Sequence, residues 1–179
     1  MASVIKKLPH YTYEDYLHWE GRWELIEGFP YAMSPAPAPN HQDINGKLWS
    51  VFNESLKKHC GICKAYLPID WRISDDTVVQ PDLTIVCKKI TKKYLDFLPS
   101  LVLEILSPST AYKDRHEKFE LYEQQRVKYY LIVDPQFKKI EIYELIDNKY
   151  QPVSISPSHY EFALDNHCKL PVSFAETWD

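Results

Sequence analysis

Three acidic residues of this 179-residue chain lie in segments that are otherwise apolar. Glu104 interrupts the aliphatic run LVLEIL, Asp82 opens the run DLTIV, and Glu24 lies inside WELIEG. A short apolar run of this kind predicts a strand that is buried on both faces. An ionised carboxylate in such a strand is costly unless it pairs with a cation or binds a metal. These three residues are therefore the first candidates for chemistry.

If the three carboxylates converge, their mutual repulsion requires a counter-charge. Hard carboxylate oxygens suit Mg²⁺ or Mn²⁺ as ligands. A lysine is also available, because Lys118 lies on the helix predicted directly after the strand of Glu104. Asp114 is four residues earlier and shares its helix face. The pattern favours a site in which a divalent metal and an ammonium group balance the carboxylates.

Each of these residues also has a purely structural interpretation. Glu104 can form a buried ion pair with Lys118 or Arg115 and bind no metal. Asp82 follows a proline, and Pro-Asp commonly opens a turn. Glu24 can pair with a basic residue nearby. The metal hypothesis therefore depends on the combination of these residues and on their order along the chain.

The elements that must position these residues can be predicted from periodicity. Apolar residues at helical spacing predict a long helix from about Asn40 to about Cys60, and a second long helix runs from Ser109 or Thr110 to about Gln125. Strands at 100–107 and 128–134 flank the second helix, so this β-α-β unit should make the two strands parallel. Further strands are predicted at 23–28, 63–67, 69–74, 77–87, 138–145 and 150–156, and residues 159–164 are another candidate. We expect one α/β domain over residues 1–179, with a mixed central β-sheet flanked by two long helices.

Composition restricts the class of protein. No stretch approaches the roughly 18 consecutive apolar residues of a membrane helix, and the N-terminal residues lack the apolar core of a secretory leader. We therefore expect a cytoplasmic protein without membrane contact. The net charge of −4 argues against binding nucleic acid by bulk electrostatics. It leaves room for an enzyme that grips phosphates locally through a metal.

The four cysteines are expected to be reduced thiols, as in most intracellular chains. Cys60 and Cys63 form CGIC, which has the spacing of half a zinc site or of a redox pair. A structural zinc site needs a second such pair, for which His167-Cys168 is a weak candidate. The favoured interpretation is a helix that ends near Gly61 with a buried thiol at Cys60.

The ordered set of acid, Pro-Asp, glutamate in an aliphatic strand and lysine on the next helix resembles the Uma2 family. This family falls within the PD-(D/E)XK, restriction-endonuclease-like superfamily. The resemblance covers about residues 11 to 145, with the C-terminal strands of 146–179 beyond it. Its landmarks are WELIEG (23–28), MSPAP (33–37) with His41 shortly after, QPDLTIV (80–86), LVLEILSPST (101–110) and VKYYLIVDP (127–135).

The resemblance implies a nuclease fold in which Asp82 and Glu104 bind Mg²⁺ or Mn²⁺. Glu24 would reach the same cleft as a third ligand, through water. The standard motif has a lysine two residues after the acid, where this chain has Leu106, and Lys118 would replace that lysine. The chain also has Arg126 where relatives usually carry glycine.

The remaining assignments concern residues around the expected metal site, the substrate and the oligomeric state. His41 begins the first long helix and could contact substrate, take up a proton or have no part in chemistry. Asp114 is a candidate to contact substrate or to hold a metal ligand in place. The resemblance implies a metal-dependent endonuclease that hydrolyses phosphodiester bonds in DNA, working as a homodimer or larger homo-oligomer. The alternatives are a catalytically inactive module of this fold that binds nucleic acid or protein, and a zinc or redox protein built around Cys60 and Cys63.

Overall fold

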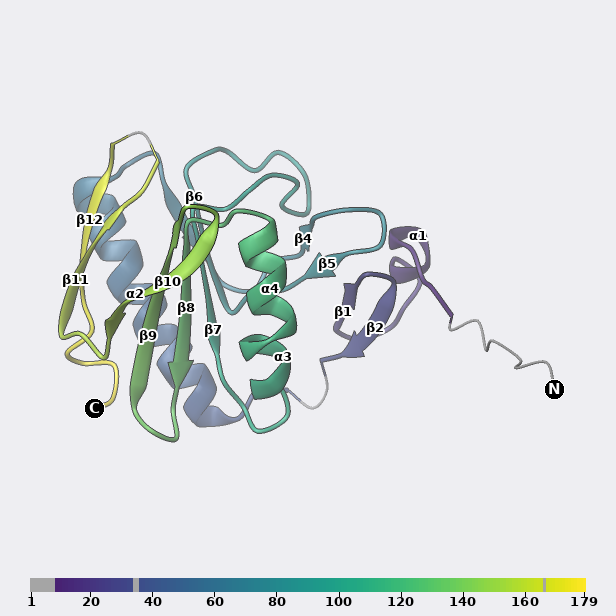
Figure 1. The fold of residues 1–179 in the computed structure, drawn as a ribbon, viewed down its shortest axis with the longest axis horizontal. Coiled ribbons are helices and arrows are strands. Elements are labelled where there is room, and N and C mark those ends of the chain that lie inside the picture. Colours follow the sequence, from purple (N-terminus) through teal and green to yellow (C-terminus); the bar gives the residue numbers. More distant parts are fainter. Residues whose placement is uncertain (1–8, 34–35, 166) are drawn as a thin grey trace.

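The aliphatic segment around Glu104 forms a central strand of a six-stranded mixed sheet (Figure 1). The computed structural model of the chain describes residues 9–33, 36–165 and 167–179. The N-terminal residues 1–8, where no leader was predicted, and residues 34–35 of the MSPAP landmark lie outside this range. In spatial order the strands of the sheet are β10 (Lys149–Ile155), β9 (Lys139–Ile146), β8 (Tyr129–Asp134), β7 (Leu101–Ile105), β6 (Leu83–Val86) and β3 (Lys64–Tyr66).

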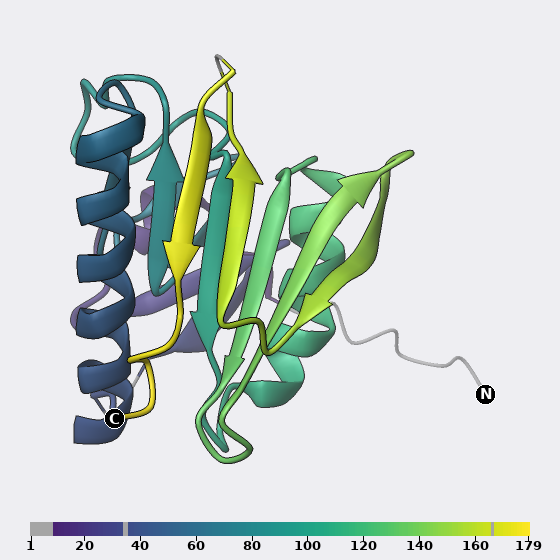
Figure 2. The ribbon, with the colours of Figure 1, turned by 90° about the vertical axis from the view of Figure 1, so that its left-hand side faces the viewer.

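Strand β7 is buried on both faces, as its aliphatic sequence predicts. Leu101, Leu103 and Ile105 pack into a core with the long helix α2 (Pro39–His59). Val102 and Leu106 pack into a second core on the opposite face. Figure 2 shows α2 on one side of the sheet and the helices that follow β7 on the other. Because side chains alternate along a strand, Glu104 projects to the face opposite α2.

The predicted β-α-β unit is confirmed, because β7 and β8 pair in parallel. The expectation of a second long helix is wrong, and α2 is the only long helix among the described residues. The segment forms two short helices, α3 (Ala111–Arg115) and α4 (Glu117–Gln124), separated at His116, whose backbone leaves the helical region (φ −123°, ψ −72°). Next to the break, the hydroxyl of Tyr130 on β8 donates to the backbone carbonyl of Asp114 at 2.8 Å. This bond comes from another element, so local periodicity does not reveal it.

A smaller, four-stranded sheet is formed by residues from the N-terminal half of the chain. Its order is β2 (Phe29–Ala32), β1 (Trp23–Ile26), β5 (Val78–Val79) and β4 (Trp71–Arg72), with the short helix α1 (Tyr13–Tyr16) beside it. The single strand predicted for 77–87 is divided between the two sheets, since β5 joins this one and β6 joins the six-stranded sheet. Pro81 lies at the division and cannot donate a ladder hydrogen bond. Asp82 therefore lies where the chain passes from one sheet to the other.

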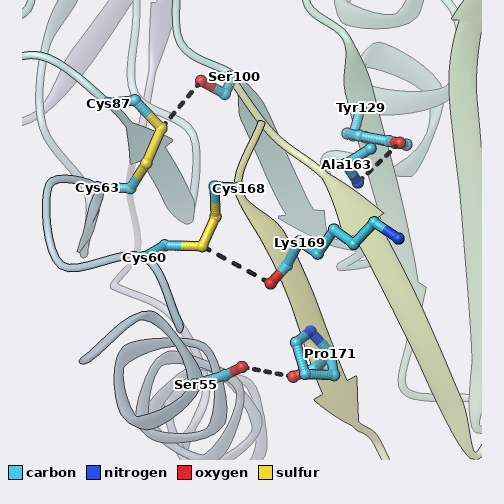
Figure 3. The surroundings of a disulfide bond; sticks show 10 residues. All are labelled: Ser55, Cys60, Cys63, Cys87, Ser100, Tyr129, Ala163, Cys168, Lys169 and Pro171. Carbon is cyan, nitrogen blue, oxygen red and sulfur yellow. Dashed lines mark hydrogen bonds between the residues drawn. A yellow bond between two sulfur atoms is a disulfide. The ribbon is translucent and has the colours of Figure 1, made fainter. Parts of the chain in front are cut away.

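The C-terminal residues form a hairpin of β11 (His159–Ala163) and β12 (Lys169–Ser173), which packs against α2. Two disulfides are present (Figure 3): Cys60 pairs with Cys168 and joins this region to the end of α2, and Cys63 pairs with Cys87 beside β3 and β6. The expectation of reduced thiols is therefore wrong for this structure. Cys60 and Cys63, which the alternative zinc or redox hypothesis would pair with each other, each bond to another cysteine. The partners are 108 and 24 residues away in sequence, so their proximity follows only from the packing.

The observed class is mixed α/β, as expected. The described part of the chain includes no helix with both the length and the apolar character that crossing a lipid bilayer requires.

Candidate active site

A cavity of about 710 Å³ opens beside the C-terminal ends of β7 and β8. Its walls include the first turn of α2, the loop between β7 and α3, and the turn after β8. Five of the six predicted site residues line it: Asp82, Glu104, Lys118, His41 and Asp114. The sixth, Glu24, is 0% exposed and lies behind the cavity wall. The fold thus gathers residues from β1, β6, β7, α2, α3 and α4 in one place.

Asp82 is fixed directly to the strand that carries Glu104. Its Oδ2 accepts a hydrogen bond from the backbone amide of Ile105 at 2.8 Å. His41 Nε2 lies 3.2 Å from the same carboxylate oxygen and 3.1 Å from the carbonyl oxygen of Ile105. The side-chain amide of Asn45 also donates to the backbone carbonyl of Asp82 at 3.1 Å. Asp82 is therefore held against the strand that carries Glu104 by bonds from β7 and α2.

The buried position of Glu104 is explained by two donors from α4. Its Oε1 accepts hydrogen bonds from Lys118 Nζ at 2.8 Å and from the hydroxyl of Tyr122 at 2.7 Å. Leu106, at the position of the standard motif lysine, is buried in the apolar core that includes Tyr122. The ammonium group beside the glutamate is therefore supplied by the helix rather than by the strand.

Glu24 joins two lysines. Lys118 Nζ lies 2.7 Å from Glu24 Oε1, and Lys113 Nζ lies 2.5 Å from Glu24 Oε2. The backbone amide of Gln80 also donates to Oε1 at 2.8 Å. Both oxygens of Glu24 are therefore engaged by protein donors. This arrangement suits a residue that positions lysines.

The charges of this cluster perturb each other. Burial raises the pKa of Glu104 well above its usual value, and although Lys118 lowers it, the nearby carboxylates add to the rise. Burial also raises the pKa of Asp114. For Lys118, burial favours the neutral form, but the carboxylates outweigh it and raise its pKa well above 10.5. Burial also opposes the charged form of His41, but the hydrogen bond and the negative charge of Asp82 leave the pKa of His41 raised. The excess of carboxylates over lysines favours binding of a further cation.

The donor set fits Mg²⁺ or Mn²⁺. Among the described residues, Asp82 Oδ1 and Glu104 Oε2 form no hydrogen bond, and neither is among the enclosed polar atoms that lack a partner. Both residues line the cavity, so each has one carboxylate oxygen for a ligand there. Within the same residues, no cluster of three or more His, Cys, Asp or Glu side chains is arranged around a metal position. Mg²⁺ commonly binds proteins through only one or two carboxylates and keeps several waters.

Asp114 lies beside this pair without joining it. Its side chain is 2% exposed, and its Oδ1 forms no hydrogen bond with any described residue. Lys118 Nζ is 3.7 Å from that oxygen, which is an ion-pair distance but too long for a hydrogen bond. Asp134, a further acid at the cavity, accepts bonds from the backbone amides of Gln136 and Phe137 and so fixes the turn after β8.

Sequence reasoning missed Lys113 and the hydroxyl of Tyr122. Helical spacing can place Tyr122 on the inner face of its helix, but which group its hydroxyl meets depends on packing. Lys113 and Lys118 are five residues apart, so an unbroken helix would direct them about 140° apart. The break at His116 removes that constraint, and both ammonium groups reach Glu24. The local sequence contains no signal for this convergence.

Comparisons with known proteins identify the family and the fold of this chain. The sequence pattern of the Uma2 family, described as "Putative restriction endonuclease", matches residues 13–168. An uncharacterized protein of Synechocystis sp. (strain ATCC 27184 / PCC 6803 / Kazusa), slr1290, is 32% identical over 154 residues, which are 82% of this chain and 80% of that protein.

A solved structure has the same fold. It is described as "a putative nuclease belonging to DUF820" from Anabaena variabilis ATCC 29413. The TM-score is 0.73 at 18% identity, over 93% of this chain and 97% of the other. The family pattern covers most of the chain, and the curated relative is similar along most of its length. The chain therefore belongs to the Uma2 family.

Proposed function

We propose that this protein is a metal-dependent endonuclease that hydrolyses phosphodiester bonds in DNA. One observation carries the proposal: Asp82 and Glu104 are joined through the backbone of Ile105, and each has a carboxylate oxygen available to the same cavity. Lys118 lies beside them at 2.8 Å from Glu104. Membership of a family described as "Putative restriction endonuclease" supports this proposal.

Asp82 and Glu104 would hold the metal, which when bound would polarise the phosphate and lower the pKa of a coordinated water. Lys118 remains protonated at neutral pH, because its carboxylate partners raise its pKa. It therefore acts as a fixed positive charge that stabilises negative charge in the transition state, rather than as a general base. Glu24 positions this ammonium group. His41 holds the Asp82 carboxylate against β7.

Cleavage of supercoiled plasmid DNA tests the proposal. Wild-type protein should nick the plasmid with Mg²⁺ or Mn²⁺ and not in excess EDTA. Asp82→Asn and Glu104→Gln should each reduce the rate by about 100-fold or more, since each removes a metal ligand. Glu161→Gln, in the distant hairpin, is the matched carboxylate control and should cleave like wild type. Cleavage by wild-type protein that persists in EDTA would overturn the mechanism.

A second candidate is a catalytically inactive module that binds nucleic acid. The observation that favours it is that all three acids have basic partners: Glu24 and Glu104 have lysines, and Asp82 has His41. Isothermal titration with Mn²⁺ separates the two candidates. An endonuclease binds the ion and loses that binding in Asp82→Asn, whereas an inactive module binds DNA without cutting it and shows no such metal site.

A further inference from the structure

Lys113 differs from Lys118 in how many of its donors the protein uses. A lysine ammonium group has three N–H donors. Lys118 lies within hydrogen-bond distance of Glu24 and of Glu104, with Asp114 at 3.7 Å, and its side chain is 1% exposed. Lys118 is thus directed almost entirely at protein carboxylates.

The ammonium group of Lys113 has one strong acceptor among the described residues, Glu24 Oε2 at 2.5 Å. Its other neighbours are weak acceptors, the sulfur of Met33 at 3.7 Å and the ring of Tyr31 with its centroid 5.2 Å away. The side chain is 11% exposed and lines the same cavity as Asp82. Lys113 therefore keeps donor capacity for a ligand in that cavity.

We infer that Lys113 binds a non-bridging oxygen of a DNA backbone phosphate in the cavity. This inference rests on the proposed nuclease function and adds a substrate contact to it. The chemistry is complementary, because the cavity carries several carboxylates that repel a phosphodiester and a lysine offsets this repulsion. Glu24 holds the ammonium group in place, so little side-chain freedom is lost when the phosphate binds. Lys113 is then a substrate-binding residue, distinct from the metal ligands.

Salt-dependent DNA binding tests this role without requiring cleavage. Fluorescence anisotropy with a labelled duplex, in EDTA and over about 50–200 mM salt, gives the slope of log K against log salt. Loss of one phosphate contact reduces that slope by about 0.9. Lys113→Gln should show this reduction and bind about 10-fold more weakly at the lowest salt, as expected for loss of a charge-assisted hydrogen bond. Lys113→Arg should keep the slope.

Lys149→Gln is the matched control, because Lys149 also pairs with one glutamate, Glu123 at 2.7 Å, but lies outside the cavity. It should leave the slope unchanged. If Lys113→Gln does not fold, the double variant Glu24→Gln/Lys113→Gln replaces it. That variant removes the opposite charges together and should lose the same slope.

Two results would overturn the inference, and they can be told apart. If wild-type protein binds DNA and Lys113→Gln keeps the full slope, Lys113 has only a structural role, seen as a lower melting temperature, while the proposed function stands. If wild-type protein binds no DNA at any of these salt concentrations, the inference falls, and the proposed function falls with it only if the protein also fails to nick the plasmid with Mn²⁺.

Discussion

Replacing Glu104 by glutamine should separate metal binding from folding. The amide oxygen of Gln can still accept the bonds from Lys118 Nζ and Tyr122, which are 2.8 and 2.7 Å long in the wild type. After the substitution Lys118 keeps two counter-charges, Glu24 at 2.7 Å and Asp114 at 3.7 Å. We expect Glu104→Gln to unfold in EDTA within about 1 kcal/mol of wild type. Glu104→Ala leaves both donors without this acceptor and should lose about 3 kcal/mol.

Metal should then distinguish the two proteins. At a Mn²⁺ concentration about 100 times its Kd, one site stabilises the folded state by about 2.7 kcal/mol. For a domain of this size that corresponds to a rise in Tm of about 5–10 °C. Wild type should show this rise and Glu104→Gln should not. Thermal unfolding followed by circular dichroism, in EDTA and in Mn²⁺, measures both the stability without metal and the rise in Tm with metal.

Glu161→Gln controls for general effects of losing a surface carboxylate, since Glu161 is 58% exposed in the C-terminal hairpin. It should gain the same stabilisation from Mn²⁺ as wild type. An equal gain in Glu104→Gln would refute the assignment of Glu104 as a ligand. A loss of several kcal/mol by Glu104→Gln in EDTA would show that the charge itself is needed for folding.

Three further predictions concern stability. Although burial opposes its ionisation, hydrogen bonds led by the one from Arg115 lower the pKa of Glu141 to about 2. Because the pKa is lower in the folded than in the unfolded protein, Glu141→Gln should cost about 1–2 kcal/mol of stability at pH 7. In urea denaturation this difference between the two proteins should shrink as the pH falls below about 4.3 and should be lost as the pH passes through the folded pKa. Arg126 has a left-handed backbone (φ 66°), so Arg126→Gly should raise stability by about 0.5–1 kcal/mol in urea denaturation, and a loss would contradict this. Thiol titration of the denatured protein, without reductant, should detect no free cysteine. Reduction should release four thiols and lower the Tm. Detection of four thiols before reduction would contradict the observed pairing.

The sequence by itself determined the long helix α2, the buried strand β7 and which residues are chemically unusual. The aliphatic run around Glu104 identifies a strand buried on both faces, because a short run without polar alternation has no solvent-facing side. The same pattern shows that this glutamate needs a partner. The order of the landmark segments, from WELIEG to VKYYLIVDP, is sufficient to indicate the family, which the comparisons confirm.

The tertiary structure alone decided which groups meet. The bond from Ile105 to Asp82 and the convergence of Lys113 and Lys118 on Glu24 join residues 23 to 94 positions apart. The broken helix and the two disulfides have the same origin. Local sequence governs backbone preference within an element, whereas these contacts depend on how distant elements pack. The chain therefore indicates which residues are chemically unusual, and the packing decides which of them face the cavity and which hold the others in place.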